Sequence, residues 1–309
     1  MDIVTHGLTG CLVARAVTGH MSWPVAAAAV AGALAPDLDA LAGAWNPLAP
    51  ITVHRTATHS FVGGLPLALA VAGTLRLASS SLSFGLLAIV AYLGVLSHIG
   101  LDLLTPYGTA VLWPLDARRL SLGWLYVIDP VVTGAVLTGL LLMRRARHPR
   151  RVAHVALAAV TAYALVAGAM GWWARVEFGR RLAAEGLARA RLVVVPVFPG
   201  PLRWLGVAET EETVHLARFW LGAQSPQLLT PLRRPIAEVP SGVDGLAEVR
   251  AFRAFARVPW RTLIADEDGQ IVEYRDLAFE DHPWGGPMAL RVRLDRAGFV
   301  RAVELGHKL

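Results

Sequence analysis

The sequence predicts a mainly α-helical membrane bundle followed by a smaller β-rich domain. Of its 309 residues, 55% are hydrophobic and only 17% are charged, whereas a soluble domain carries about 25% charged residues. The pattern changes near residue 174, because long apolar segments precede this point and short segments with regular charges follow it. We therefore expect a membrane helical bundle with a metal site over residues 1–174 and a β-rich extramembrane domain over residues 175–309.

Six apolar segments in the first part are expected to form helices. A helix needs about 20 mostly apolar residues to cross a bilayer. The segment 152–173 fits best, because it has this length and ends in a Trp pair suited to a membrane interface. The segment 84–104 is equally long but carries His98 and Asp102. The shorter segments are 7–18, 23–35, 61–78 and 130–143. We expect five or six helices, of which about four cross the membrane.

The second part of the chain has the pattern of strands joined by turns. Five segments are rich in β-branched and aromatic residues: RLVVVPVF (191–198), ETVHLARFWL (212–221), VPWRTLIA (258–265), IVEYRDLAF (271–279) and MALRVRLD (288–295). DEDGQ (266–270) and DRAG (295–298) are expected hairpin turns, and FPGPLRW (198–204) is expected to be non-helical. Residues 246–257 are expected to form a helix.

Composition also limits the class of function. The single cysteine, Cys11, allows neither an intrachain disulfide nor a cysteine-based zinc site, so a bound metal would need His and carboxylate ligands. The net charge of +6 comes almost entirely from Arg, without a basic patch interleaved with aromatic residues, so no nucleic-acid partner is expected. The start, MDIVTHGLTG, lacks the positive region of a cleaved signal peptide. The expected partners are the lipid bilayer and a small-molecule or lipid substrate.

Four clusters of His and Asp residues lie at the ends of apolar segments. His6 opens the first segment, Asp37 and Asp39 of PDLD close the second, His54 and His59 of HRTATHS open the third, and His98 and Asp102 of SHIGLD close the fourth. In an up-and-down bundle, this alternation of start and end places all four clusters on one face. His98 and Asp102 are four residues apart, so they share a helix face and can bind one cation together. Such side chains are costly near membrane depth unless they are paired or metal-bound.

Each cluster taken alone also has a structural explanation. His6 can hydrogen-bond at a helix start, Asp37 after Pro36 can be an N-cap, and His54 can be an exposed loop residue. His98 and Asp102 can be a structural pair that joins helices. Because the four clusters share one face and one chemistry, we expect a metal site.

The ordered motifs THGLTG, PDLD, HRTATHS, SHIGLDLLTPYG and LWPLD resemble those of the YdjM-type membrane-bound metal-dependent hydrolases, closely over about residues 1–135. The later PGPLRW and DLAF stretches are similar to that family's C-terminal part. The family in turn resembles zinc-dependent phospholipase C and the related single-strand nucleases, which use helix-borne His and Asp ligands. The resemblance implies a phospholipase C-like metal site with a divalent metal, first of all Zn²⁺. The chain lacks that enzyme's N-terminal Trp ligand and a second HxxxE pair, so one or two ions are expected. The implied ligands are His6, an Asp of PDLD, His59, His98 and Asp102.

These residues predict a membrane-bound metal-dependent hydrolase. A bound divalent ion lowers the pKa of its water to about 7. We take Asp37 as the ligand and Asp39 as the acceptor of the water's proton, with the reverse assignment open. His54 is expected to act on the substrate, and Arg55 is suited to hold a phosphate or carboxylate bidentately. Superfamily analogy suggests a phosphoester or lipid-like substrate at the membrane surface.

Residues next to the metal motifs have further expected roles. Tyr107 and Trp113 are expected to line the substrate entrance. Asp129, before Pro130, is either an N-cap or a hydrogen-bond partner of a ligating His.

The alternative function is a non-enzymatic metal-binding membrane protein in transport or envelope assembly. A transporter would show polar residues at mid-span in several helices, whereas here they gather at helix ends. A third reading is a metal that only stiffens the bundle.

The loop RRARHPRR (144–151) predicts the orientation of a multi-pass protein in the inner membrane. Its five arginines mark the cytoplasmic side. The segments before and after this loop each lead to the opposite side. We therefore expect the metal site and the C-terminal domain on the same, extracytoplasmic face.

Overall fold

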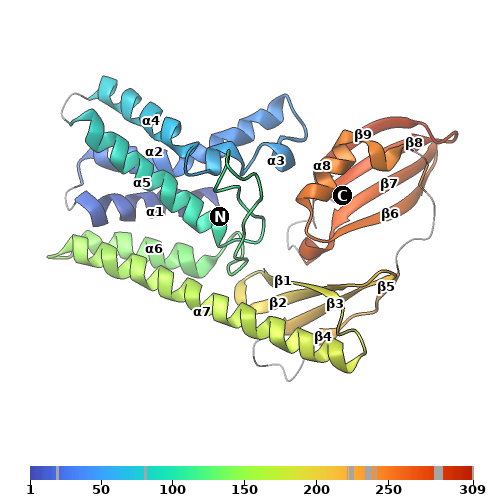
Figure 1. The fold of residues 1–309 in the computed structure, drawn as a ribbon. Helices are drawn as coiled ribbons and strands as arrows, with labels where there is room; N and C mark the ends of the chain where they lie inside the picture. The colour runs from blue at the N-terminus through green and yellow to red at the C-terminus, as the bar shows by residue number, and fades with distance from the viewer. Residues whose placement is uncertain are drawn as a thin grey trace. The chain divides into compact units, whose positions relative to one another are not determined.

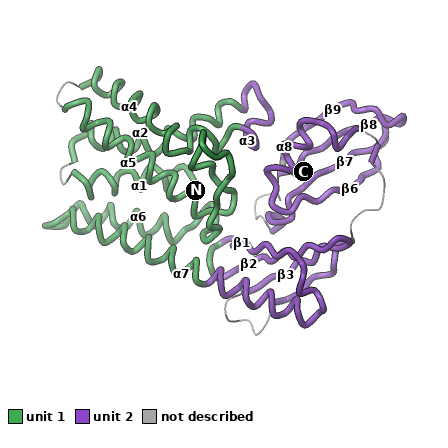
Figure 2. Tube along the Cα trace, in the orientation of Figure 1, with its two compact units in different colours: residues 1–42, 53–169, 199–201 green, residues 43–52, 170–198, 202–309 purple. Residues whose placement is uncertain are grey.

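A computed structural model describes residues 1–18, 21–79, 82–220, 222, 226–233, 239–240, 242–281 and 288–307 (Figure 1). The chain divides into two compact units (Figure 2). Unit 1 comprises residues 1–42, 53–169 and 199–201, and unit 2 comprises residues 43–52, 170–198 and 202–309. The main boundary between the units lies between residues 169 and 170, inside the helix Pro149–Ala184. This is close to the change of sequence pattern near residue 174.

Unit 1 is helical. Its helices are α1 (Ile3–Thr18), α2 (Trp23–Leu34), α4 (Gly64–Ala78), α5 (Phe84–Leu103), α6 (Pro130–Met143) and the first part of α7 (Pro149–Ala184). Two 3₁₀ helices, η1 (Ala35–Ala44) and η2 (Ala57–His59), follow α2 and precede α4. The six expected apolar segments therefore form helices, but α7 continues past the expected end at 173 to Ala184.

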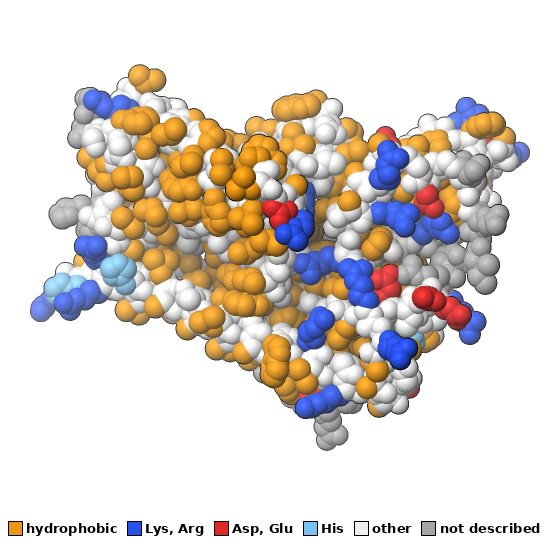
Figure 3. Space-filling model, in the orientation of Figure 1, with side chains coloured by type: hydrophobic (Ala, Val, Ile, Leu, Met, Phe, Trp, Pro, Cys, Tyr) orange, Lys and Arg blue, Asp and Glu red, His pale blue; other side chains and the backbone are white. Residues whose placement is uncertain are grey.

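Among the described residues, three helical segments are long and apolar enough to cross a membrane. They are Trp23–Ala44, Phe84–Leu103 and Pro149–Ala184, and a fourth results if Ala49–His59 and Gly64–Ala78, bent by 74°, are one span. α1 and α6 are apolar but shorter. Figure 3 shows hydrophobic side chains over most of the visible face of the helical unit, whereas basic and His side chains gather where α6 meets α7. This distribution is the one expected of helices that contact lipid.

Glycines bring α2 and α5 into close contact at the centre of unit 1. A Cβ added to Gly32 would lie 2.1 Å from the carbonyl oxygen of Ala91, and one added to Gly94 would lie 2.3 Å from the carbonyl oxygen of Ala29. Small residues allow membrane helices to approach this closely. The contact places the end of α2, which leads into PDLD, beside the second half of α5.

Asp129 is the N-cap of α6. Its Oδ1 accepts hydrogen bonds from the backbone N–H groups of Val131 at 2.9 Å and Val132 at 3.2 Å. The Tyr163 hydroxyl donates to Oδ2 at 2.9 Å. Of the two roles considered for Asp129, these contacts match the capping role.

The described residues of unit 2 form two antiparallel sheets. The first has the order β1 (Arg191–Val197), β2 (Gly200–Glu209), β3 (Thr213–Trp220) and β4 (Gln227–Leu228), and β5 (Leu232–Arg233) also pairs with β3. The second has the order β6 (Pro259–Asp266), β7 (Gly269–Asp276), β8 (Met288–Asp295) and β9 (Val300–His307). The short elements are α3 (Ala49–Thr52), η3 (Val243–Gly245), α8 (Ala247–Phe255) and η4 (Leu277–Phe279).

The expected β-rich character of the second part is confirmed, and four strands were not expected, namely β2, β9 and the two-residue strands β4 and β5. The turns at 266–270 and 295–298 and the helix within 246–257 occur as predicted. Most of FPGPLRW lies in strand β2, and β9 follows the second of these turns. Leu221, the last residue of one predicted strand, lies outside the described residues.

The first sheet packs against the last part of α7. A Cβ on Gly171 would lie 2.7 Å from the Trp204 ring, and one on Gly206 would lie 2.6 Å from the Phe178 ring. Both glycines let a large ring lie directly on backbone. Phe178, Trp204 and Phe219 are buried in one cluster between the helix and the sheet.

Candidate metal centre

The four His and Asp clusters meet at one end of unit 1. The side chains of His6, His59 and His98 are fully buried, and that of Asp102 is 1% exposed. They come from α1, from η2 before α4, and from the last turns of α5, and η1 after α2 adds Asp37 and Asp39. The chain direction explains the meeting, because helix starts and helix ends alternate along an up-and-down bundle.

Five donor groups surround one small volume. Oδ1 of Asp37 lies 3.4 Å from Nε2 of His59 and 3.5 Å from Nε2 of His98. Oδ2 of Asp102 lies 3.6 Å and 3.5 Å from the same two nitrogens. Nε2 of His6 lies 3.3 Å from Oδ1 of Asp102. Among the described residues, three groups could hold a metal ion: His6, His98 and Asp102; Asp37, His59 and His98; and Asp39, His54 and His59. His98 belongs to the first two of them.

The spacing of these atoms fits a divalent cation. Metal bonds of about 2.0–2.2 Å at tetrahedral angles separate neighbouring ligand atoms by about 3.3–3.6 Å, which is the range of the distances above. In the described structure, Nε2 of His6, His59 and His98 and Oδ2 of Asp102 are buried without a hydrogen-bond partner. Leaving such atoms unsatisfied costs about 1–3 kcal/mol each, and a cation bound among them would remove this cost.

In His98 and His59, the Nδ1 nitrogen faces away from the converging donor atoms and has partners of its own. Nδ1 of His98 lies 2.7 Å from the carbonyl oxygen of Ala33. Nδ1 of His59 lies 3.0 Å from Oγ1 of Thr58 and 3.3 Å from Oδ2 of Asp39. Partners of this kind fix the ring orientation of a metal-binding histidine and leave Nε2 for the metal.

The two carboxylates of PDLD lie on opposite sides of His59. Asp37 faces Nε2, on the side of the converging donors, and Asp39 faces Nδ1. The geometry therefore favours Asp37 over Asp39 as a ligand of a metal bound between His59 and His98.

His54 and Asp39 form a pair at the edge of the cluster. Nδ1 of His54 lies 2.6 Å from Oδ1 of Asp39, whose side chain is only 3% exposed. The His54 side chain is 29% exposed, and its ring meets the His59 ring edge-on with centroids 5.0 Å apart. An accessible imidazole backed by a buried carboxylate is an arrangement suited to proton transfer.

Arg55 lies inside the cluster rather than at its entrance. Its side chain is 6% exposed. Its Nη2 donates to Oδ1 of Asp102 at 3.0 Å, and its Nη1 donates to Oγ1 of Thr105 at 2.8 Å. Its backbone has a left-handed φ of 62°, uncommon for a residue other than glycine. The amino group of Met1 also contacts Oδ1 of Asp102. The guanidinium therefore orients Oδ1 of Asp102, which also lies near His6, while Oδ2 faces His59 and His98.

Tyr107 and Arg119, from the loop after α5, contact residues of the site. The Arg55 guanidinium lies 5.4 Å from the centroid of the Tyr107 ring. The Trp113 side chain is 37% exposed, and its place at a substrate entrance stays a prediction. Nη2 of Arg119 donates to the carbonyl oxygen of His54 at 2.8 Å. Burial, and secondarily the charge of Arg55, lower the pKa of Arg119 to about 10, so it remains a cation at neutral pH.

Sequence reasoning missed three of these supporting residues. Thr58 lies inside HRTATHS and Thr105 inside SHIGLDLLTPYG, so their motifs contained the signal. A hydroxyl gives no sign of its partner in one sequence, and nothing marked Arg119.

One comparison with known proteins gives the class of the chain. The family model described as YdjM inner membrane protein matches residues 1–174. A relative from Bacillus subtilis (strain 168), named Uncharacterized protein YfhP, is 29% identical over 140 residues. That match covers 43% of this chain and 43% of the relative's own length. No solved structure matches the chain.

Proposed function

Because the chain belongs to the YdjM inner membrane protein family, it is a membrane protein, and we propose that it is a metal-dependent hydrolase. We further propose that its substrate is a phosphoester, in a lipid-like molecule at the membrane surface. The observation that carries the proposal is the convergence of three imidazole nitrogens and two carboxylates, at 3.3–3.6 Å, beside the His54–Asp39 pair.

The proposed ligands are His6, Asp37, His59, His98 and Asp102. Imidazole and carboxylate donors suit Zn²⁺, and the related metals Mn²⁺ and Fe²⁺ also accept them. His98 has one nitrogen for a metal, since its Nδ1 faces the Ala33 carbonyl. Because the two donor groups that contain His98 share that nitrogen, they favour one ion between them. A bound ion of this kind supplies a water of lowered pKa and polarises a phosphoryl oxygen.

The protein's own residues supply proton transfer and orientation. His54, which is partly exposed, accepts a proton from the attacking water or returns one to the leaving oxygen. Asp39 holds the His54 ring through Nδ1 and stabilises its protonated form. Arg55 fixes Asp102, so we assign it a positioning role and not direct contact with the substrate.

A lipid-like substrate is supported by apolar side chains next to the site residues in the chain. Leu38, between the two aspartates of PDLD, is 61% exposed, and Leu41 is 63% exposed. In the loop after α5, Leu115 is 88% exposed. Leu38 and Leu41 belong to the candidate span Trp23–Ala44, where exposed leucines suit contact with acyl chains.

The test starts with elemental analysis of the protein purified in detergent. We expect about one equivalent of a divalent transition metal, as for a site with a single ligand shell. The same sample is then assayed with a phosphomonoester, a phosphodiester and a short-chain phospholipid. Hydrolysis that is lost on chelation and restored by metal supports the proposal.

The competing function predicts a different combination of results. A non-enzymatic metal-binding protein would hold the metal but hydrolyse none of the three substrates. That outcome would overturn the hydrolase proposal and retain the metal centre.

A further inference from the structure

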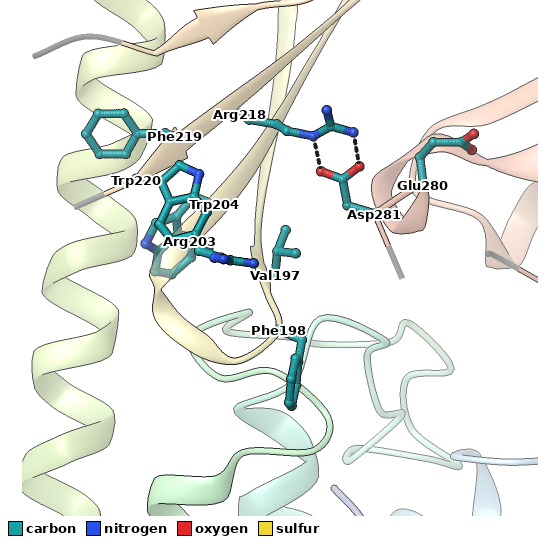
Figure 4. A pocket seen from close by; sticks show the side chains of 9 residues that line it. All are labelled: Val197, Phe198, Arg203, Trp204, Arg218, Phe219, Trp220, Glu280 and Asp281. Atoms are coloured by element: carbon teal, nitrogen blue, oxygen red, sulfur yellow. Dashed lines mark hydrogen bonds and ion pairs between the residues drawn. The ribbon is translucent and has the colours of Figure 1, made fainter. Parts of the chain in front are cut away.

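Unit 2 contains a cavity of about 370 Å³ that lies on the first sheet. Its lining includes Arg203, Trp204, Arg218, Trp220 and Asp281 (Figure 4). Its volume is within the range of small-molecule sites. All of the lining residues belong to unit 2, so the cavity is separate from the metal centre.

Arg203 is held flat over an aromatic ring in this cavity. Arg203 on β2 pairs directly with Trp220 on β3, and its guanidinium carbon lies 3.5 Å from the centroid of the Trp220 ring. Figure 4 shows the two side chains together at the cavity. Stacking of this kind fixes the plane of the guanidinium while its N–H groups remain available.

The other charges of the cavity are paired. Arg218 forms a bidentate ion pair with Asp281, in which Nε lies 2.7 Å from Oδ2 and Nη2 lies 2.6 Å from Oδ1. Nη1 of Arg275 donates a hydrogen bond to Oε1 of Glu280 at 3.2 Å. Among the described residues, Arg203 has no carboxylate partner within ion-pair distance. The cavity therefore presents one positive charge that a bound anion can neutralise.

The end of the apolar run in α7 indicates the depth of this cavity in the membrane. The run ends at Trp172, which is 68% exposed, and Trp173, which is 37% exposed. Tryptophans at such positions mark the level of the lipid headgroups. The Trp173 ring contacts that of Phe219, a lining residue, with centroids 5.1 Å apart. Gly171 lets Trp204, also a lining residue, lie directly on the helix.

We propose that this cavity binds the phosphate of an anionic phospholipid headgroup, with Arg203 as the principal donor. An anionic headgroup carries one net negative charge, which matches the one uncompensated positive charge. Leu202 and Trp220, next to the cation in the sheet, are 51% and 48% exposed and provide apolar surface for the start of the acyl chains. The proposal is independent of metal binding and hydrolysis.

The test is lipid binding to the full-length protein after delipidation in detergent, followed by native mass spectrometry. The probes are a short-chain phosphatidylglycerol, the matching phosphatidylcholine, and inorganic phosphate. We expect phosphatidylglycerol to bind at least tenfold more tightly than phosphatidylcholine. Both lipids carry the phosphate, but the choline ammonium cancels its charge and repels Arg203, and like charges about 4 Å apart near a protein surface cost on the order of 1–4 kcal/mol. The substitution Arg203→Gln should remove this preference, and Trp220→Leu should weaken it.

The matched control is Arg233→Gln. Arg233 is an exposed arginine on β5 of the same sheet and does not line the cavity, so its loss should leave the preference unchanged. Equal melting temperatures of the variants show that the sheet is folded, and Arg203→Lys, which keeps the charge, should retain part of the preference. Unchanged selectivity in Arg203→Gln would overturn the proposal. Binding of inorganic phosphate as tight as that of phosphatidylglycerol would overturn the assignment to a lipid.

Discussion

Nδ1 of His54 lies 2.6 Å from Oδ1 of Asp39, while Oδ2 of the same carboxylate lies 3.3 Å from Nδ1 of His59. One buried carboxylate therefore holds both a partly exposed imidazole and a fully buried one. Thr58 donates to Oδ2 at 2.5 Å and completes the group. This link joins a residue suited to proton transfer to a residue suited to metal binding.

The first prediction concerns His54. The substitution His54→Ala should lower the rate of phosphoester hydrolysis about 100-fold or more, which is the usual contribution of a general acid or base. Bound metal should remain, because the shared donors are on other residues. Steady-state kinetics and elemental analysis of the same sample test both statements.

A matched comparison for this variant is Asp39→Asn. An amide in place of the carboxylate keeps the shape of the side chain but no longer stabilises a protonated His54. Turnover should decrease here as well, with a shifted pH profile, whereas a purely structural role would lower protein yield and leave the profile of the remaining enzyme unchanged. If both variants hydrolyse substrate at the wild-type rate, the proposed role of the pair is wrong.

The second prediction concerns metal content. The substitution His98→Ala should remove most of the bound metal, because His98 belongs to two of the three donor groups. His148→Ala is the control, since His148 is exposed in the loop between α6 and α7. The wild-type protein should also melt at a lower temperature after chelation, because metal binding stabilises only the folded state. Full metal occupancy in His98→Ala would contradict the ligand assignment.

The third prediction concerns the contact between α2 and α5. The substitution Gly32→Ala forces a methyl group to within 2.1 Å of the Ala91 carbonyl oxygen, so the helices must separate. Overpacking of this kind costs about 1–3 kcal/mol, and a shift of α2 also displaces Asp37 from His98. We expect a melting temperature lower by about 5 °C, together with weaker metal retention.

Gly100→Ala is the control for this variant. Gly100 lies on α5 between His98 and Asp102, and a Cβ there would meet nothing within 4 Å. The change should leave both the melting temperature and the metal content near those of the wild type. An equal effect of the two substitutions would show that helix proximity is not the cause.

The meeting of the four polar clusters could be predicted from the sequence because it depends only on chain direction. His6 and His59 precede apolar segments, whereas Asp37 and Asp102 follow or end them, and helices that alternate in direction bring such positions together. The prediction needed no knowledge of helix tilt or side-chain packing. Their roles as metal ligands stay a prediction until metal is measured.

The separate positions of Asp37, Asp39 and Arg55 within the site could not be predicted in the same way. Asp37 and Asp39 are two residues apart in a 3₁₀ helix, and only three-dimensional packing shows that they face opposite nitrogens of His59. Arg55 was expected to hold a substrate anion, but the structure shows its guanidinium bonded to Asp102 and Thr105. That arrangement depends on a left-handed backbone at Arg55, which the sequence does not signal.

The fourth prediction concerns Asp276, which begins the DLAF stretch. Its side chain is buried, and its carboxylate accepts hydrogen bonds from the backbone N–H groups of Arg257, Val258 and Ala278. The substitution Asp276→Ala leaves three donors without an acceptor, which should lower the free energy of unfolding by about 3 kcal/mol. Asp268→Ala, in the exposed turn between β6 and β7, should change it by less than about 0.5 kcal/mol. Denaturant unfolding followed by far-UV circular dichroism measures both.

The last prediction concerns the side of the membrane on which the metal centre lies. The end of α6 and the start of α7 lie at one end of unit 1, together with the ends of α1 and α4 and the starts of α2 and α5 (Figure 1). The metal-site residues lie at the opposite ends of their helices. Because the five arginines of residues 144–151 favour the cytoplasm, we expect the metal centre on the extracytoplasmic face. α7 then leads the chain to that same face.

Two reporters attached after residue 309 test this orientation. Alkaline phosphatase folds only outside the cytoplasm, so its fusion should be active, and a fluorescent protein exported in unfolded form should remain dark. A cysteine introduced at Leu115, 88% exposed in the loop after α5, reports on the metal side directly. In a variant that also carries Cys11→Ser, a membrane-impermeant thiol reagent should label this cysteine in intact cells. Labelling only after lysis, together with a bright cytoplasmic reporter, would reverse the orientation, because both sites would then lie on the side assigned here to the arginine loop.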